Sequence, residues 1–416
     1  MPETDVYDVD DLNAPLLATD PYAFFGPLRE ADPVHWNPHR KAWMVTRYDD
    51  VTFITRNPEI FSSAPRMLKA SEFYPPIDEE AWDLVDSVDP AYRGHLGLGL
   101  GDILVLSADR PDHLRMREAL HEWFTPRNVR RWTDLLRTTV DTLIEARYDE
   151  HRMEFKNDFA TRLPFLAIRI MLDLPESDAL HIKATAERLT NPADGTAGAV
   201  AALHELAGYF GPLLDERGKN PGDDILSLIA AGERNGVYTR PQAISVAITV
   251  LLAGHETTLT LITNGLHAFI KNPDQWDLLR TDPDGLAHKA VEECLRMEPS
   301  LVLINRRATR DIELSGTVMH AGDDVYGVLA AANRDPHAFE NPDRFDITRF
   351  PNRHVTFGGG IHHCLGAALA RLETQTAFAA LAKRFERFAL AQPTIDYLPD
   401  VFVHHMHQPT ELNVTW

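Results

Sequence analysis

A cysteine that follows a run of glycines is the most chemically distinctive feature of the sequence. The stretch Phe357-Gly-Gly-Gly-Ile-His-His-Cys364-Leu-Gly366 leads directly into a helical pattern that we expect to begin at about Cys364. At the first turn of a helix, free N–H groups and the positive end of the helix dipole stabilise an anion, so we expect a lowered thiol pKa and a thiolate. The glycines let amides approach the sulfur. One thiolate cannot build a four-ligand zinc site, but it suits the axial position of a haem iron.

A histidine and a glutamate stand next to each other inside a long apolar helical pattern. We expect that helix to run from Thr239, as its N-cap, to about Ile270, and roughly thirty helical residues span about 45 Å. The segment Ala253-Gly-His-Glu-Thr-Thr258 interrupts its apolar run. A zinc-protease motif, His-Glu-x-x-His, would need a second histidine where this chain has Leu259. Metalloprotease chemistry is therefore excluded for this pair.

The cysteine loop resembles the haem-binding loop of the cytochrome P450 family. The family pattern Phe-x-x-Gly-x-x-x-Cys-x-Gly is matched at Phe357, Gly360, Cys364 and Gly366. The resemblance implies a mainly α-helical fold with a small β portion and a long central helix over a buried haem b. It also implies one domain spanning residues 1–416, of which 1–14 form a disordered acidic tail. The activity implied is that of a bacterial haem-thiolate monooxygenase with O2 as co-substrate.

Two further segments strengthen the resemblance because they occur in family order. Glu293-Cys-Leu-Arg296 resembles the family's Glu-x-x-Arg pair, which alone would be an ordinary i,i+3 ion pair worth about 0.2–0.5 kcal/mol. In Pro342-Asp-Arg344-Phe345, Arg344 resembles the third member of the charge set that fixes the fold behind the haem. The other cysteine, Cys294, is expected in the core.

The resemblance places Gly254, Glu256 and Thr257 on the oxygen-binding side of the haem. Gly254 would allow a local opening of the helix, and the Thr257 hydroxyl would replace a lost backbone bond. Glu256 and Thr257 would then relay protons to dioxygen, a general-acid contribution of about 10²–10⁴-fold. The alternative is a threonine-rich kink without a catalytic role.

The resemblance also assigns partners to the two haem propionates, which favour cationic or hydrogen-bonding groups. Motif matching selects four basic residues, with Arg115 and Arg307 as the neighbouring alternatives: His113, Arg117, Arg306 and His362.

Substrate contacts are expected from two long segments, Phe73–Leu106 and Leu174–Tyr209, and from apolar side chains on the helix, a strand and a turn. The side chains are Ile248, Leu252, Ala253, Val302, Leu303 and Phe402. Because all six are apolar, we expect an apolar or aromatic organic substrate. His404, His405 and His407 lack a carboxylate or thiolate partner nearby, so we interpret them as strand or surface histidines rather than metal ligands.

The elements that must position these residues are mainly helical. After a helix at Pro21–Ala31 and two strands at Val34–Trp36 and Ala42–Thr46, the pattern is helical from Arg110 to about Glu298. Short strands follow, then an irregular stretch at Arg334–Gly360. A last helix runs to Phe385, and a β-like tail occupies Tyr397–Trp416.

Composition narrows the class of protein. With 416 residues, 44% of them hydrophobic, the chain can bury a large core, which excludes fibrous and disordered proteins. The net charge, 41 − 62 = −21, disfavours binding to nucleic acid or anionic membranes. Two cysteines and an acidic start without a signal-peptide pattern fit a cytoplasmic protein. The apolar run Ala243–Leu252 is too short to span a bilayer.

The electrons must come from another protein, because nothing here resembles a flavin, nicotinamide or iron–sulfur site. Residues 110–131 carry a net charge of +3, six arginines against three acids: Arg110, Arg115, Arg117, Arg127, Arg130 and Arg131. We expect this patch to guide an acidic ferredoxin or flavodoxin, itself supplied by an NAD(P)H-dependent reductase. A merely solvated charged helix is the alternative.

Two other functions remain open. A haem-thiolate sensor or binding protein without turnover would lack the acid–alcohol pair or carry an effector segment. A peroxide-driven peroxygenase would carry a basic residue where Glu256 and Thr257 stand. This sequence carries the acid–alcohol pair and has no basic residue in its place, so we rank the monooxygenase above both alternatives.

Overall fold

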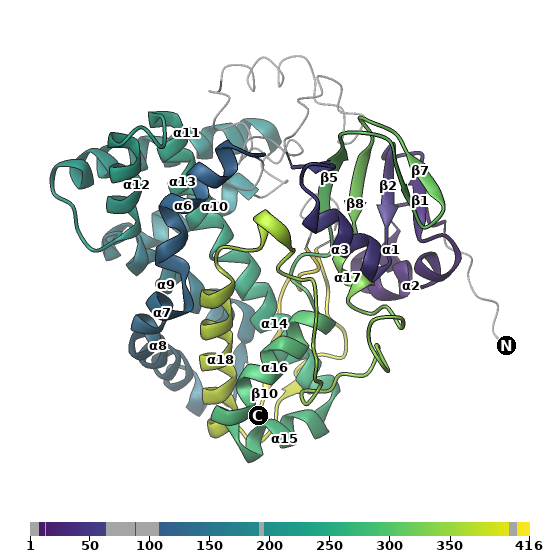
Figure 1. The fold of residues 1–416 in the computed structure, drawn as a ribbon. Coiled ribbons are helices and arrows are strands. Elements are labelled where there is room, and N and C mark those ends of the chain that lie inside the picture. The colour runs from purple at the N-terminus through teal and green to yellow at the C-terminus, as the bar shows by residue number, and fades with distance from the viewer. Residues whose placement is uncertain (1–7, 13, 64–87, 89–107, 191–194, 399–405) are drawn as a thin grey trace.

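The computed structural model describes residues 8–12, 14–63, 88, 108–190, 195–398 and 406–416. Helices gather in one part of the molecule, and the largest sheet, with helices packed against it, forms the other (Figure 1). The chain is therefore mainly helical with a smaller β portion, as the sequence predicts. The predicted disorder of residues 1–14 is wrong for its described part, because Leu12 and Ala14 are buried in an apolar cluster with Phe24 and Phe25.

The β portion is built from the beginning of the chain and from a later segment. The Asp20 side chain caps helix α2 (Pro21–Ala31) by accepting from two backbone amides. The predicted strands form an antiparallel hairpin, β1 (Val34–Asn37) and β2 (Ala42–Val45). They belong to a five-stranded sheet of order β1-β2-β8-β5-β3, in which β2 and β8 are parallel. The other members and their helices are β3 (Phe61–Ser62), β5 (Ile304–Ala308), β8 (Asp324–Gly327), α1 (Pro15–Thr19), α3 (Tyr48–Arg56) and α17 (Leu329–Ala332).

The helical portion covers most of the region that the sequence predicts as helix. Its elements before the central helix are α6 (Asp112–His121), α7 (Pro126–Val129), α8 (Thr133–Glu145), α9 (Arg162–Met171), α10 (Ala179–Thr190), α11 (Gly195–Lys219) and α12 (Ile225–Arg234). Those after it are α15 (Pro273–Thr281), α16 (Pro283–Met297) and α18 (Ala367–Arg384). A π-helix, η5 (Lys156–Ala160), precedes α9.

The long central helix is interrupted. Thr239 is its N-cap and forms a capping box with Gln242, as the predicted start requires. The helix then runs as α13 (Arg240–Ala253) and α14 (Glu256–Lys271), with Gly254 and His255 between them. Arg240–Lys271 is the one described stretch long and apolar enough to cross a membrane, but two thirds of its most apolar window is buried inside the protein. Its apolar surface thus serves the core.

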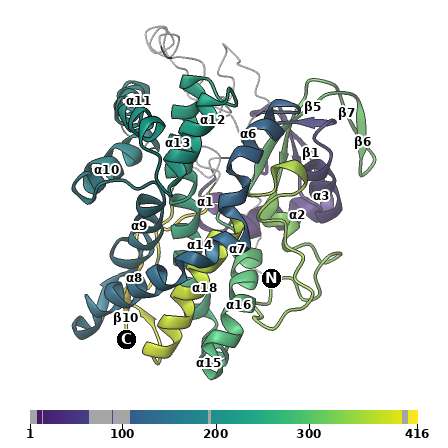
Figure 2. The ribbon, with the colours of Figure 1, turned by 60° about the vertical axis from the view of Figure 1, so that its left-hand side comes forward.

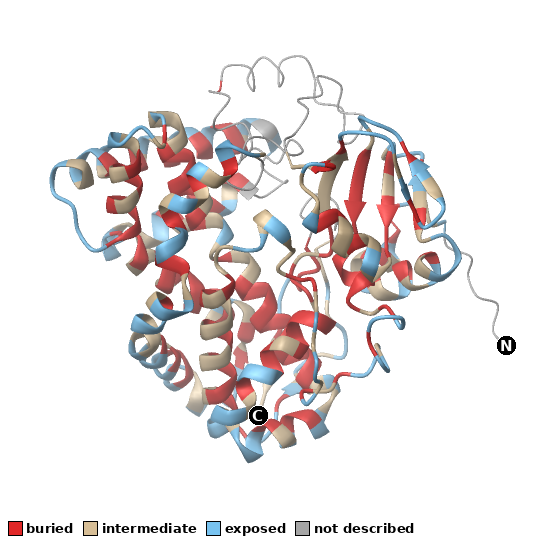
Figure 3. Ribbon diagram, viewed as in Figure 1, coloured by how far each residue is buried: buried red, intermediate tan, exposed pale blue. Residues whose placement is uncertain are grey.

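The core lies on both sides of this interruption. One cluster of buried apolar residues packs α13 against α6, α11 and α12, and a second packs α14 against α8, α16 and α18. Figure 3 shows the buried residues concentrated along these helices. The packing leaves the break between two rigid bodies of side chains.

The last part of the chain returns to the centre of the molecule. No helix longer than one turn and no strand occurs between α17 and α18, which confirms the irregular stretch expected there. The described part of the tail forms β10 (Asn413–Thr415), which lies between β4 (Arg152–Glu154) and β9 (Ala389–Leu390). A separate hairpin joins β6 (Ile312–Leu314) and β7 (Thr317–Met319).

Candidate active site

The cysteine loop is a tight turn packed against α3. Gly358 and Gly360 adopt positive φ angles of 65° and 60°, which favour glycine. A Cβ at Gly360 would lie 2.7 Å from the backbone oxygen of Thr55, so only glycine permits this approach. The amide of Cys364 donates to the Phe357 carbonyl at 2.9 Å, which closes the loop.

The position of Cys364 corrects one expectation. Helix α18 begins at Ala367, so the cysteine precedes the helix instead of occupying its first turn. Burial raises the pKa of the Cys364 thiol, although the Gly366 amide and the Arg117 guanidinium act to lower it. The expected lowering of the thiol pKa is therefore wrong for the chain alone. The side chain still reaches solvent, and a metal ion bound to its sulfur would hold it as thiolate.

Two buried histidines meet beside the loop. His113 on α6 is fully buried, and its ring centroid lies 4.2 Å from that of His362 in the loop. Both ring nitrogens of His113 and Nε2 of His362 are buried without a hydrogen-bond partner in the described structure. Arg117, one turn further along α6, donates to the backbone oxygen of His363 at 2.6 Å. Figure 2 shows α6 next to the segment that leads into α18.

The electrostatics of this group are those of basic side chains that lack an anionic partner among the described residues, so the two histidines stay neutral. Burial and the nearby arginines lower the pKa of His113 to about 4 and that of His362 to about 3. Burial lowers even the pKa of Arg306, on β5, to about 10. The nearby acid, Asp109, is already bonded to the Ser63 amide at 3.0 Å and to the Ser62 hydroxyl.

The residues present fit a haem at this place. Several buried donors without partners need an anionic group that carries several acceptor oxygens, and two propionates provide four. The four predicted basic residues, His113, Arg117, Arg306 and His362, lie close enough to perturb one another electrostatically. Cys364 lies two residues after His362, so one ligand could contact both the thiol and the bases.

The break in the central helix has the predicted internal geometry. The Thr257 hydroxyl donates to the Ala253 carbonyl at 3.0 Å, replacing a backbone bond. A Cβ on Gly254 would lie 2.4 Å from Cδ1 of Ile168, so the close approach predicted for this glycine is present. Glu256 and Thr257 are half-buried, and they share one partly accessible helix face with Leu252 and Ala253.

His255 points away from this face. It is buried, its ring centroid lies 5.6 Å from that of Phe165, and burial lowers its pKa to about 4. Among the described residues there is no group of three or more histidine, cysteine or acidic side chains that could hold a metal ion.

The substrate-contact candidates are divided by burial. Ile248 is fully buried in the core around α13, and Val302 and Leu303 pack with the helices that begin the chain, so none of the three has an accessible side chain. Their contact with a substrate stays a prediction. Phe402, most of Phe73–Leu106, His404 and His405 lie outside the described residues. His407 is buried and its ring is stacked on Tyr397 at 4.1 Å, so the surface alternative for this histidine is wrong.

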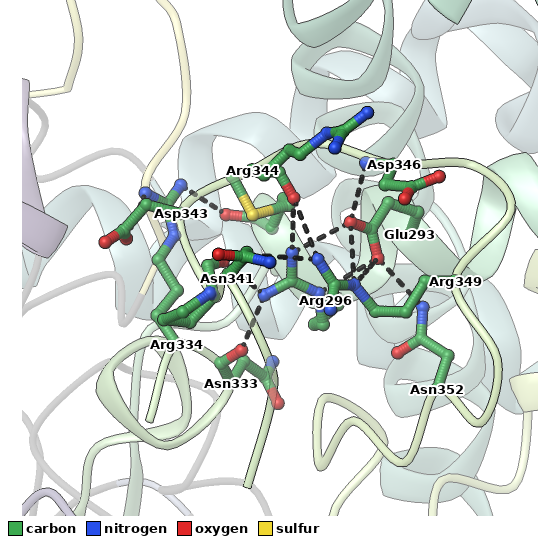
Figure 4. Close-up of polar contacts among 12 residues, drawn as sticks. Glu293, Arg296, Asn333, Arg334, Asn341, Asp343, Arg344, Asp346, Arg349 and Asn352 are labelled. Carbon is green, nitrogen blue, oxygen red and sulfur yellow. Dashed lines mark hydrogen bonds and ion pairs between the residues drawn. The ribbon is translucent and has the colours of Figure 1, made fainter. Parts of the chain in front are cut away.

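The charge set behind the loop is present, with one member changed. Glu293 and Arg296 are fully buried and 2.8 Å apart. The third cation is Arg349, whose Nε lies 3.2 Å from both Glu293 oxygens. Arg344 contributes its backbone oxygen to Arg296 at 3.1 Å, while its side chain points away (Figure 4). The prediction of the Arg344 side chain as the third member is therefore wrong: Arg344 lies within the motif, and the guanidinium that reaches Glu293 belongs to Arg349, five residues later.

A second ion pair beside the loop has no signal in the sequence. Glu292 accepts from Arg371 at 2.6 Å and contacts His354 at 3.0 Å. Burial raises the pKa of Glu292, but these two partners outweigh it and bring the pKa to about 2. The guanidinium of Arg371 also lies 4.5 Å from the Phe357 ring centroid. These contacts tie α16 and α18 to the cysteine loop and border a cleft of about 410 Å³.

The basic patch at residues 110–131 is smaller than the sequence suggests. Arg131 lies 4.0 Å from the Trp123 ring centroid and forms an ion pair with Asp223 at 3.1 Å. Arg115 is paired with Asp112, and Arg117 faces the site. Arg110, Arg127 and Arg130 remain exposed and make no ion pair with a described residue.

The mainly helical fold, the broken central helix and the cysteine loop beside basic residues agree with the predicted resemblance, and the chain belongs to the cytochrome P450 family, which implies a haem with a cysteine ligand. The family model "Cytochrome P450" matches residues 212–405. The "Biotin biosynthesis cytochrome P450" of Bacillus subtilis (strain 168) is 33% identical over 389 residues, covering 91% of this chain and 93% of the relative.

Other relatives give the same result. "Cytochrome P450 monooxygenase PikC" of Streptomyces venezuelae is 34% identical over 382 residues, covering 90% of this chain and 86% of that protein. The crystal structure of P450BioI in complex with hexadec-9Z-enoic acid ligated acyl carrier protein has a TM-score of 0.84 at 32% identity, covering 97% and 99% of the two chains. The predicted family, fold class and enzyme class, a cytochrome P450 monooxygenase, are confirmed.

Proposed function

We propose that Cys364 is the axial ligand of a haem b and that the enzyme inserts one oxygen atom of O2 into an apolar or aromatic organic substrate. The observation that carries this proposal is the set of four basic residues, unpaired with an anion, beside an accessible cysteine. Two histidines and two arginines supply the donors that propionates need, and the cysteine supplies the ligand on the same loop. When bound, the haem would supply the binding and reduction of dioxygen.

The chain's own residues would orient the substrate and deliver protons. Leu252 and Ala253 present apolar surface on the accessible helix face, next to Glu256 and Thr257. The Thr257 hydroxyl donates its proton to the Ala253 carbonyl and keeps its lone pairs free to accept one from Glu256 or from water. Rotation of that hydroxyl would then pass a proton toward the oxygen side.

Replacing Cys364 by serine tests the ligand. We expect Cys364→Ser to bind haem weakly and to lose the thiolate signature of the wild-type carbon-monoxide difference spectrum. Cys294→Ser is the matched control, because that thiol is buried in the core and should leave the spectrum unchanged. A Cys364→Ser protein with a wild-type spectrum would refute the proposal.

Replacing Thr257 by alanine tests the relay. We expect intact haem binding, but a fall of about tenfold or more in product formed per NAD(P)H, with hydrogen peroxide formed instead. This outcome also separates the monooxygenase from a sensor, which forms no product, and from a peroxygenase, which needs no NAD(P)H. Full coupling in Thr257→Ala would remove the relay from the mechanism.

The electron donor is proposed to be a cytoplasmic ferredoxin or flavodoxin served by an NAD(P)H-dependent reductase. Exposed Arg110, Arg127 and Arg130 favour an acidic partner. Replacing Arg127 and Arg130 by glutamate should slow electron transfer and flatten its dependence on salt. An unchanged rate would place the docking surface elsewhere.

A further inference from the structure

Two side chains from outside the central helix hold the main chain of the acid–alcohol pair. The first is Ser300, which is buried just before the segment Leu301–Leu303. Its Oγ donates to the backbone oxygen of Thr257 at 2.6 Å. A serine hydroxyl has one proton, so this short bond commits it to that carbonyl.

The second side chain is Gln408, in the last described segment of the chain. Its Nε2 donates to Oγ1 of Thr260 at 2.6 Å, and Oγ1 of Thr260 donates to the backbone oxygen of Glu256 at 2.8 Å. Both side chains are well enclosed: Thr260 is fully buried and Gln408 is 7% exposed. The carbonyl of Glu256 is thereby linked to Gln408 through one hydroxyl.

The two side chains belong to one connected structure. Leu301, which follows Ser300, forms a β-bridge with Met406. The amide of Asn264 on α14 donates to the backbone oxygen of His407 at 2.8 Å, which fixes the same segment to the helix. We call Ser300 and Gln408 together the clamp.

A clamp is physically useful at this point because the helix has lost some of its own bonds. The Ala253 carbonyl accepts from the Thr257 hydroxyl, and the His255 amide donates to the Leu252 carbonyl, three residues back instead of four. The first turn of α14 therefore begins without the continuous ladder that holds a regular helix. A misplacement of a reacting group by about 1 Å can cost about 10²-fold in rate.

We propose that Ser300 and Gln408 are positioning residues that fix the orientation of Thr257 and Glu256 during turnover. Ser300 acts on the Thr257 carbonyl directly, and Gln408 acts on that of Glu256 through Thr260. Since Ser300 continues into a segment predicted to contact the substrate, the same clamp would link that segment to the relay. The inference rests on the proposed function of Glu256 and Thr257.

The test compares Ser300→Ala and Gln408→Leu with the wild-type holoenzyme. Loss of one hydrogen bond of this kind should lower product formed per NAD(P)H by about fivefold in Ser300→Ala, with peroxide rising in proportion. A smaller fall, about twofold, is expected in Gln408→Leu, which acts through a second hydroxyl. KM for substrate and the carbon-monoxide spectrum should stay unchanged, and Ser300→Thr should restore coupling.

A readout that does not depend on turnover is the exchange of backbone amide hydrogens. We expect the amides of residues 256–260 to exchange faster in both variants, because their carbonyls lose an external partner. This measurement also decides the matter if Ser300→Ala folds poorly, since Gln408→Leu reports on the same turn.

Thr263→Val is the matched control. Thr263 lies on the same helix, is fully buried, and its hydroxyl donates to the Leu259 carbonyl at 2.7 Å. Its loss should leave coupling unchanged. Normal coupling and exchange in Ser300→Ala, or equal uncoupling in Thr263→Val, would overturn the clamp while Thr257→Ala still uncouples. Full coupling in Thr257→Ala would instead overturn the proposed function itself.

Discussion

Buried charges are handled in opposite ways in two regions of this molecule. Behind the cysteine loop, Glu293, Arg296 and Arg349 satisfy one another, and Arg296 also donates to three backbone oxygens. Between α6, β5 and the loop, the buried His113 and the half-buried His362 and Arg306 form no ion pair with a described residue. Removing a charge from water is costly unless a partner compensates.

The contrast distinguishes structural from ligand-binding charge. A network of buried charges whose partners all belong to the chain requires no ligand. Its loss should therefore lower the free energy of unfolding. A group of basic side chains without an anionic partner in the chain carries a desolvation cost, which an anionic ligand can offset. The two regions should therefore respond to mutation in different measurements.

The largest effect is expected when the buried network of Glu293, Arg296 and Arg349 loses its carboxylate. Glu293→Ala leaves Arg296 and Arg349 buried without their carboxylate, and the free energy of unfolding should fall by about 3–5 kcal/mol. Urea unfolding measures this fall. Arg344→Ala is the matched control, because it keeps the backbone oxygen and removes only a side chain that points outward; it should change stability by less than about 0.5 kcal/mol. A loss in Arg344→Ala equal to that in Glu293→Ala would contradict the revised charge set.

A smaller effect, in a different measurement, is expected from the open group. Arg306→Leu should weaken haem binding by about tenfold or more, as expected for a lost charge-assisted hydrogen bond, without lowering the stability of the haem-free chain. Titration with haem followed by absorbance gives the first quantity, and thermal unfolding gives the second.

The neighbouring arginine serves as the control for Arg306. Arg307 is paired with Asp324 at 2.5 Å, so Arg307→Leu should lower stability and leave haem affinity nearly unchanged. Weaker haem binding in Arg307→Leu, with lower stability in Arg306→Leu, would instead identify Arg307 as the propionate partner on β5.

Some features of this site could be predicted from the sequence and others could not, because some depend on neighbouring residues and others on distant ones. Local constraints are readable: the glycine loop, the capped central helix and the bond from Thr257 to Ala253 all depend on residues close in sequence. Contacts between distant segments are not. Ser300 and Gln408 are ordinary polar residues until the fold brings them to α14, and nothing nearby in sequence predicts this.

The misassigned arginine has the same cause. Arg344 and Arg349 are five residues apart, and the turn of the backbone between them decides which guanidinium enters the core.

The predicted thiol pKa of Cys364 is wrong for another reason. The helix begins three residues later than its pattern suggests, and burial, which the sequence does not report, outweighs the amides.

The smallest effect is expected from a buried acid whose raised pKa favours its neutral, protonated form. Glu373 on α18 is fully buried and forms no ion pair with a described residue, and burial raises its pKa well above the usual value although the neighbouring Thr258 hydroxyl acts to lower it. Its folded-state pKa exceeds that of the unfolded chain, so between the two values the folded state binds more protons and stability falls as pH rises. Glu373→Gln removes that titration, so it should gain roughly 1 kcal/mol over wild type at pH 8 and less at pH 5. Urea midpoints at the two pH values measure the difference, with exposed Glu118→Gln as the control that should show none. If the unfolding midpoint of the variant depends on pH as that of the wild type does, Glu373 has a cationic or hydrogen-bonding partner in solution. It would then be stabilised by that partner and not by protonation.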